Sequence, residues 1–158
     1  ENEKGTHNLS TKDLCLVKHL KDMIDENNIG NQLKLMGQTT DLYERYKKYA
    51  FVVMTSRYEG FPMSLIEAIA NRLPMISFDI LTGPNEIINN GVNGFLINNE
   101  SDEEMIQKIE KLITEPGMRS KMSEESFQTA KLFSLERIVE QWLQLFREIV
   151  NPLRNQNK

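Results

Sequence analysis

The sequence predicts an α/β fold with a parallel sheet that is covered by helices on both faces. Short apolar runs alternate with longer segments of helical periodicity, which is the order that a parallel sheet requires. The run 51–54 is expected to be a buried central strand, and it leads through a glycine-containing turn into an apolar helix over 64–70. A second apolar run, 74–78, follows that helix at once, so a strand–helix–strand unit is complete.

The composition is that of one ordinary domain. The 158 residues are enough to bury a core, and 39% are hydrophobic and 27% charged. A formal net charge of -4 without a basic stripe argues against a nucleic-acid binder. No apolar run approaches the length of a membrane span and no leader opens the chain, which predicts a cytoplasmic location, or at most the inner face of the membrane. The lone Cys15 excludes an intrachain disulfide, and we expect it to be a small buried hydrophobe.

The first fifty residues predict two helices and a strand. Residues 1–10 are polar and are expected to be a loop or a cut end. Ser10 or Thr11 is expected to cap a helix over 12–27. A short strand over 33–36 ends at a glycine, and a helix follows over 41–49. The apolar residues expected on the buried faces of the two helices are Leu16, Leu20, Met23, Ile24, Leu42, Tyr46 and Tyr49.

The chain beyond residue 90 predicts a last strand and three helices. The strand spans 93–97, and the capping-box sequence 101–104 opens a helix over 102–114. Pro116 and Gly117 end that helix, and another covers 119–131. Ser134 is expected to cap a final helix that runs to about 150, with a polar tail over 151–158.

The turn after the run 51–54 is typical of a phosphate-binding site. Parallel sheets bind such ligands at the carboxyl ends of their strands, where a helix begins. Gly60 allows a close approach of the backbone, and Pro62 fits the first helical turn because no N–H is needed there. The first amides of the helix lack partners and the helix dipole favours an anion. Glu59 lies in the loop, and Glu67 lies about two turns along the helix.

Glu59 and Glu67, with seven residues between them, resemble the E-x(7)-E signature of the group 1 (family 4) retaining glycosyltransferases, whose fold is GT-B. Segments 71–79, 83–88, 91–97 and 133–137, with Trp142, follow in the order of that family. The resemblance covers about 20 to 148. It implies that 1–150 is a partial nucleotide-sugar-binding domain, Rossmann-like and C-terminal in GT-B, without its first strand–helix units or the acceptor-binding partner domain.

The resemblance also assigns roles to residues. It implies that Glu59 is the catalytic residue, which meets the hydroxyls of the donor sugar, and that Glu67 meets the ribose. An ionised carboxylate accepts two hydroxyl protons side by side, which suits such diols. An exposed surface glutamate is the alternative for both. The diphosphate is expected on the amides at the helix start, and the donor-binding residues are Arg57, Gly60, Phe61, Pro62, Met63, Ser64, Leu65 and Glu67.

Charge limits what this chain is expected to do alone. A helix end contributes about 0.3–1 kcal/mol to anion binding, too little for a departing diphosphate. The family adds an arginine and a lysine from the absent first unit, and Arg57 is the nearest cation here, with an ordinary surface arginine an equal alternative. We expect weak donor binding, no turnover by the fragment and, because no D-x-D pair occurs, no metal or other cofactor. A uridine diphosphate sugar is the first choice of donor, and guanosine diphosphate mannose the next.

Other interpretations stay open. Segment 83–86 closes over the donor or is a plain turn into a helix, and segment 37–39 is a weaker candidate for contact with the base. Asn71 and Arg72 stand where the family has a small residue and a glycine. Glycoside hydrolysis is rejected because it requires two carboxylates that flank one bond, whereas the two signature glutamates would meet different parts of an elongated ligand. A non-catalytic nucleotide-sugar-binding or interaction domain, or a purely structural α/β domain, remains an alternative function.

Overall fold

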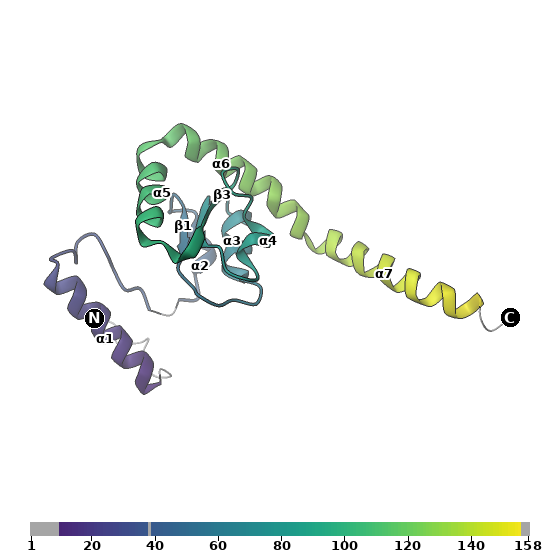
Figure 1. Ribbon diagram of the computed structural model, residues 1–158, viewed down its shortest axis with the longest axis horizontal. Helices are drawn as coiled ribbons and strands as arrows, with labels where there is room; N and C mark the ends of the chain where they lie inside the picture. Colours follow the sequence, from purple (N-terminus) through teal and green to yellow (C-terminus); the bar gives the residue numbers. More distant parts are fainter. Residues whose placement is uncertain (1–9, 38, 156–158) are drawn as a thin grey trace. The chain divides into compact units, whose positions relative to one another are not determined.

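The computed structural model describes residues 10–37 and 39–155 (Figure 1). The chain forms two compact units, Glu1–Leu42 and Tyr43–Lys158. The second unit contains the sheet and the segment with the two glutamates. Most of the predicted loop 1–10 lies outside the described residues.

Within the described residues, the sheet has three strands and all of its pairings are parallel. They are β1 (Val52–Met54), β2 (Met75–Phe78) and β3 (Gly94–Ile97), in the order β1-β2-β3. The predicted α/β class is therefore confirmed. The run 51–54 was expected to be a buried central strand, and this is wrong. β1 lies at an edge of the described sheet with Val53 38% exposed, whereas all four residues of β2 are buried.

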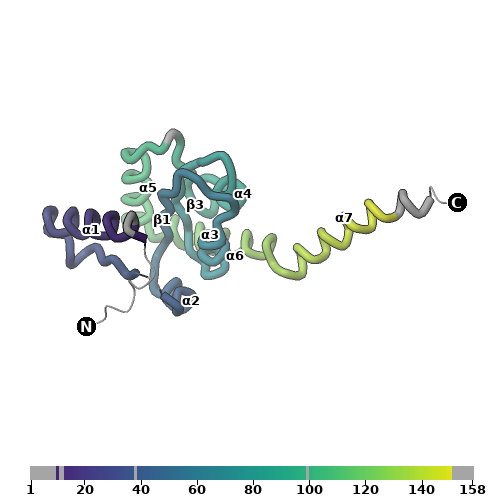
Figure 2. Tube along the Cα trace, turned by 90° about the horizontal axis from the view of Figure 1, so that it is seen from below, coloured from purple at the N-terminus to yellow at the C-terminus, as the bar shows by residue number. Residues whose placement is uncertain are grey.

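Alternate residues of β2 face two different cores. Met75 packs with residues of α3 (Met63–Ala70) and α4 (Pro84–Ile87). Ile76 and Phe78 face the other way, toward α5 (Asp102–Thr114) and α6 (Pro116–Ala130). Figures 1 and 2 show β1 and β3 between α5 on one side and α3 and α4 on the other. The first core comprises Tyr46, Leu65, Ala68, Ile69, Leu73, Met75, Ile87 and Ile88, and the second Ile76, Phe78, Ile80, Phe95, Ile97, Met105, Leu112 and Met122.

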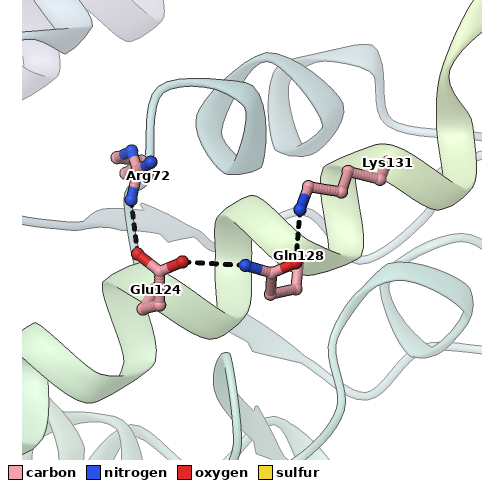
Figure 3. A network of polar contacts seen from close by, with 4 residues as sticks. All are labelled: Arg72, Glu124, Gln128 and Lys131. Carbon is pink, nitrogen blue, oxygen red and sulfur yellow. Dashed lines mark hydrogen bonds and ion pairs between the residues drawn. The ribbon is translucent and has the colours of Figure 1, made fainter.

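The turn after α3 is fastened to α6 by a polar network (Figure 3). Arg72 has a φ of 61°, a left-handed conformation. Glycine adopts this conformation readily, which explains the glycine expected here from the family resemblance. Its guanidinium pairs with Glu124 at 2.5 Å and stacks on Phe127. Gln128 donates to the other oxygen of Glu124 at 2.8 Å, and Lys131 donates to Gln128. The hydrogen bond from Gln128, and then that from Arg72, lowers the pKa of Glu124.

A buried asparagine organises the turn before β3. The Asn93 side chain accepts a hydrogen bond from the backbone N–H of Asn89 at 2.8 Å and donates to the carbonyl of Ile87 and the hydroxyl of Thr129 at 3.0 Å each. Ser126 donates to the Asn93 carbonyl. No water reaches Asn93, so these bonds satisfy groups that burial would otherwise penalise.

In the first unit, the predicted first helix is confirmed as α1 (Thr11–Glu26). Ser10 and Asp13 form a capping box, and the bonds from Ser10 lower the pKa of Asp13. The helix does not bury its apolar face among the residues that the structure describes. Cys15 is exposed, so the expectation of a buried cysteine is wrong. The exposed apolar residues of α1 are Leu14, Leu16, Leu20 and Met23.

The predicted strand over 33–36 is wrong. These residues form no strand, because no described strand pairs with them and their backbone has no ladder to join. Leu33, Leu35 and Met36 are exposed. The helix expected over 41–49 is the shorter α2 (Leu42–Tyr46). Tyr46 is buried as expected, whereas Leu42 and Tyr49 are exposed.

The C-terminal elements agree with the predicted order. α5 begins and ends at the predicted residues, and the Ser101 hydroxyl accepts a bond from the amide of Glu104. Two 3₁₀ turns, η1 (Asn98–Glu100) and η2 (Lys131–Phe133), flank the last helices. α7 (Leu135–Asn155) is longer than expected and includes the start of the predicted polar tail. It leaves the sheet region in Figures 1 and 2, and none of the described helices is long and apolar enough to cross a membrane.

Candidate functional site

The candidate site lies at the carboxyl ends of β1 and β2, where two loops meet. Because the strands are parallel, the loop 55–62 after β1 and the loop 79–83 after β2 emerge at the same edge of the sheet. The hydroxyl of Thr82 donates to the carbonyl oxygen of Glu59 at 2.7 Å. The second loop therefore supports the backbone of the residue that the signature assigns to the sugar.

Gly83 leaves no room for a side chain between the two loops. Its φ is 97°, in a region that side chains rarely adopt, and a Cβ there would lie 2.7 Å from Cδ of Pro62 and 3.0 Å from the carbonyl oxygen of Gly60. Only glycine fits this place. Asn85 donates to the carbonyl of Ile80 and Glu86 accepts from the Gly83 amide.

The start of α3 has two unpaired amides. Pro62 is the N-cap residue and no side chain caps the helix. The amide of Leu65 donates to the Pro62 carbonyl at 3.0 Å, and Leu65 itself is fully buried, so this predicted donor of the diphosphate site is engaged within the protein. No partner is found among the described residues for the amides of Met63 and Ser64, which are both exposed. The anion site predicted from the sequence narrows to these two groups.

The two glutamates differ in their surroundings. Glu59 is half-buried in the loop, and Glu67 is exposed on α3. The carboxylate of Glu67 accepts a hydrogen bond from the hydroxyl of Tyr46 at 3.4 Å. Burial, and then the neighbouring Glu67 charge, raises the pKa of the Tyr46 phenol, which stays protonated at neutral pH. The sequence predicted Tyr46 as a core residue and offered no sign of this contact.

Two further predicted residues have partners in the structure. Arg57 is 81% exposed and its guanidinium pairs with Glu100 at 2.9 Å, so an acid lies beside this predicted donor-binding cation. The ring of Phe61 lies 5.9 Å from that of Phe133, between centroids, which joins the loop to η2. Phe61 thus packs on one side and is partly exposed on the other.

Three other features of the described residues bear on ligand binding, namely a cavity, the grouping of metal-ligating side chains and the predicted contacts with the base. A cavity of about 310 Å³ lies elsewhere, beside the residues that precede β1 and β2, and none of the predicted site residues lines it. No group of three or more His, Cys, Asp or Glu side chains in the described part of the chain could hold a metal ion. Of the predicted base contacts, Gln38 lies outside the described residues, and Gly37 and Thr39 belong to the first unit.

Residues 16–129 match the sequence model of a family described as glycosyl transferases, group 1. A curated relative, the poly(ribitol-phosphate) alpha-N-acetylglucosaminyltransferase of Staphylococcus aureus strain COL, is 34% identical over 125 residues. That alignment covers 78% of this chain and 25% of the relative. The chain therefore spans about a quarter of the length of that enzyme.

Solved structures agree with the described fold. The crystal structure of the pneumococcal O-GlcNAc transferase GtfA, in complex with UDP and GlcNAc, is 31% identical with a TM-score of 0.72. The match covers 84% of this chain and 27% of that one. Anabaena HepE, solved in complex with UDP, has a TM-score of 0.81 at 22% identity and covers 88% of this chain and 38% of its own, which shows the fold alone.

Proposed function

This chain belongs to the group 1 glycosyl transferases, and on that basis we propose that it binds the donor in a retaining glycosyltransferase of the GT-B fold. The complete enzyme moves a sugar from a nucleotide diphosphate sugar to a glycan or lipid-linked acceptor. One observation carries this proposal most directly. The unpaired amides of Met63 and Ser64 begin a helix that has one signature glutamate before it and another along it. Acceptor binding is assigned to the part of the enzyme beyond this chain.

The proposed division of labour follows from the chemistry of each group. The amides of Met63 and Ser64 hold the diphosphate, and the positive helix end stabilises its charge as it departs. Glu59 accepts hydrogen bonds from hydroxyls of the donor sugar. Glu67 accepts them from the ribose, two helical turns away. Thr82 and Gly83 contribute indirectly, because they support the backbone of the loop that carries Glu59.

The missing positive charge sets a limit on this chain alone. The helix end supplies about 0.3–1 kcal/mol, and the Arg57 guanidinium is paired with Glu100. We therefore propose that the chain binds donor weakly and that turnover requires cations from elsewhere in the enzyme. The leaving group is stabilised by these cations and amides, without a metal ion or other cofactor.

The donor that we propose is a uridine diphosphate sugar, with N-acetylglucosamine as the first choice. The S. aureus relative is named as an alpha-N-acetylglucosaminyltransferase, and the pneumococcal relative was solved with UDP and GlcNAc. An alpha linkage in the first name is consistent with a retaining reaction. We further propose a role in polysaccharide biosynthesis. We place the enzyme in the cytoplasm, or at most at the inner face of the membrane.

The test is calorimetric titration of the full-length enzyme with UDP-N-acetylglucosamine, GDP-mannose and ADP-glucose. We expect the uridine nucleotide to bind most tightly. In a separate assay of sugar transfer, Glu59→Gln should reduce the rate of transfer far more than it reduces UDP binding. Glu110→Gln, an exposed position on α5, is the matched control and should leave both unchanged. Tighter binding of GDP-mannose would overturn the donor assignment, and no binding of any nucleotide sugar would overturn the function.

A non-catalytic binding domain is the second candidate, and the Arg57–Glu100 pair favours it. An acid beside Arg57 weakens the attraction of this arginine for a diphosphate as the charge of the leaving group grows. Incubation of the full-length enzyme with radiolabelled donor and candidate acceptors separates the two. Labelled product supports the transferase, whereas tight donor binding without product in every acceptor tested supports the binding domain.

A further inference from the structure

The hydroxyl of the buried Tyr46 side chain lies beside two residues of α3. Tyr46 is 6% exposed and packs in the first core, beside Leu65 and Ile69. Its hydroxyl lies 3.3 Å from the carbonyl oxygen of Ser64 and 3.4 Å from a carboxylate oxygen of Glu67. A single side chain from α2 therefore touches both the turn with the unpaired amides and the second signature glutamate.

We infer that Tyr46 is a positioning residue, whose hydroxyl holds the Glu67 carboxylate ready for the ribose hydroxyls and so sets the preference for ribonucleotides. This inference rests on the proposed function, because it gives Glu67 the ribose. It goes beyond the signature, which lies wholly within 59–67 and does not include α2.

The physical argument begins with the exposure of Glu67. A glutamate on a helix surface has several rotamers, and binding a diol requires one of them, so the ligand must overcome the lost side-chain entropy. The Tyr46 ring is held by core packing, which makes its hydroxyl a donor of nearly fixed position. A donor of fixed position restricts the carboxylate before the ligand arrives and lowers that entropic cost.

The protonation state of the phenol supports the same role. The Tyr46 pKa is raised by burial and by Glu67, so the hydroxyl keeps its proton at neutral pH and remains a donor. It has one proton for two acceptors, the Ser64 carbonyl and the Glu67 carboxylate. When the hydroxyl donates this proton to Glu67, the Ser64 carbonyl in the first turn of α3 loses it.

The experiment compares two nucleotides on full-length Tyr46→Phe, which keeps the ring and removes only the hydroxyl. The probes are UDP and 2′,3′-dideoxy-UDP, measured by calorimetric titration. We expect UDP to bind about 2- to 12-fold more weakly, the range for one hydrogen bond. Binding of the dideoxy nucleotide should not change, because it has no hydroxyls for Glu67 to accept. The preference for UDP then falls by the same factor.

Two controls separate positioning from packing. Tyr49→Phe makes the same chemical change at an exposed tyrosine three residues later, whose hydroxyl makes no hydrogen bond recorded among the described residues, and should affect neither nucleotide. In a Glu67→Ala background, Tyr46→Phe should have no further effect on UDP, since the two residues act through one contact.

Each contrary result has a distinct meaning. An equal loss for both nucleotides would show that Tyr46 only packs, and no loss for either would show that its hydroxyl is idle; both overturn the inference while the proposed function stands. Wild-type enzyme that binds UDP and dideoxy-UDP equally would overturn the ribose role of Glu67, and this inference with it. Wild-type enzyme that does not bind UDP would overturn the proposed function itself.

Discussion

The guanidinium of Arg72 lies 2.5 Å from the Glu124 carboxylate and 3.9 Å from the centre of the Phe127 ring (Figure 3). This contact joins the C-terminal end of α3 to the middle of α6, and the N-terminal end of α3 carries the candidate anion site. Arg72 makes it from a left-handed backbone conformation, which costs an ordinary residue about 1–2 kcal/mol. The contacts of the side chain offset that cost.

Replacing Arg72 separates the backbone cost from the contacts. Arg72→Ala loses the ion pair and the stacking but keeps the left-handed strain, whereas Arg72→Gly loses the same contacts and relieves the strain. We expect the glycine variant to be more stable than the alanine variant by about 1 kcal/mol. The measurement is the free energy of unfolding in urea. Arg147→Ala, at an exposed position on α7, is the control and should shift it by less than about 0.5 kcal/mol. Equal stabilities of the two Arg72 variants would contradict the left-handed turn.

Gly83→Ala should disturb the loop that carries Glu59. The new methyl group would lie 2.7 Å from Pro62 and would also hold the backbone at an unfavourable positive φ. We expect a loss of about 1–3 kcal/mol in stability from the strain, and a further loss in UDP affinity because the loops move apart.

Gly91→Ala is the matched control for that change. Gly91 also has a positive φ, but nothing lies within 4 Å of the place where its Cβ would be. Alanine there should cost stability through strain alone and leave UDP affinity unchanged. If both variants lost UDP affinity to the same extent, the contact between the two loops would have no part in binding.

Asn93→Ala should destabilise the second unit strongly. The Ile87 carbonyl would lose a buried bond and the Asn89 amide a part-buried one, and a buried polar group left unsatisfied costs about 1–3 kcal/mol. We expect a loss of at least about 2 kcal/mol in urea unfolding. Gln107→Ala, an exposed position on α5, should change stability little. A loss as small as the control's would mean that water replaces the Asn93 side chain.

The Tyr46 phenol should titrate late in an alkaline titration. Its pKa is raised above the ordinary value by burial and by Glu67, so the ultraviolet absorbance of tyrosinate should show a late step. Because the folded-state pKa is the higher one, the stability that this group contributes is complete below about pH 10. That stability is lost as the pH rises through the folded-state pKa. Tyr46→Phe should remove the late step, and its persistence in that variant would assign it to another tyrosine.

The elements from residue 51 onward could be predicted from the sequence because their signals are local. Caps and breakers act within a few residues, as at Ser101 and Pro116, and helical periodicity is visible within one element. The group 1 family was predicted in the same way, from Glu59 and Glu67 with their flanking segments, and the family match over 16–129 confirms it. The strand at 33–36 was predicted on the same local grounds and is wrong, because a strand also needs a neighbour with which to pair.

What only the tertiary structure decided are contacts between residues far apart in the chain. The bond from Tyr46 to Glu67 spans 21 residues and that from Thr82 to Glu59 spans 23. No helical or strand periodicity predicts a contact over such a separation. The edge position of β1 and the ion pair between Arg57 and Glu100 likewise could not be predicted from local sequence patterns. Sequence alone determined which residue types stand at the start of α3. The packing of separate elements decided which of their atoms are free to meet a ligand, because a hydrogen bond or an ion pair depends on distance in space.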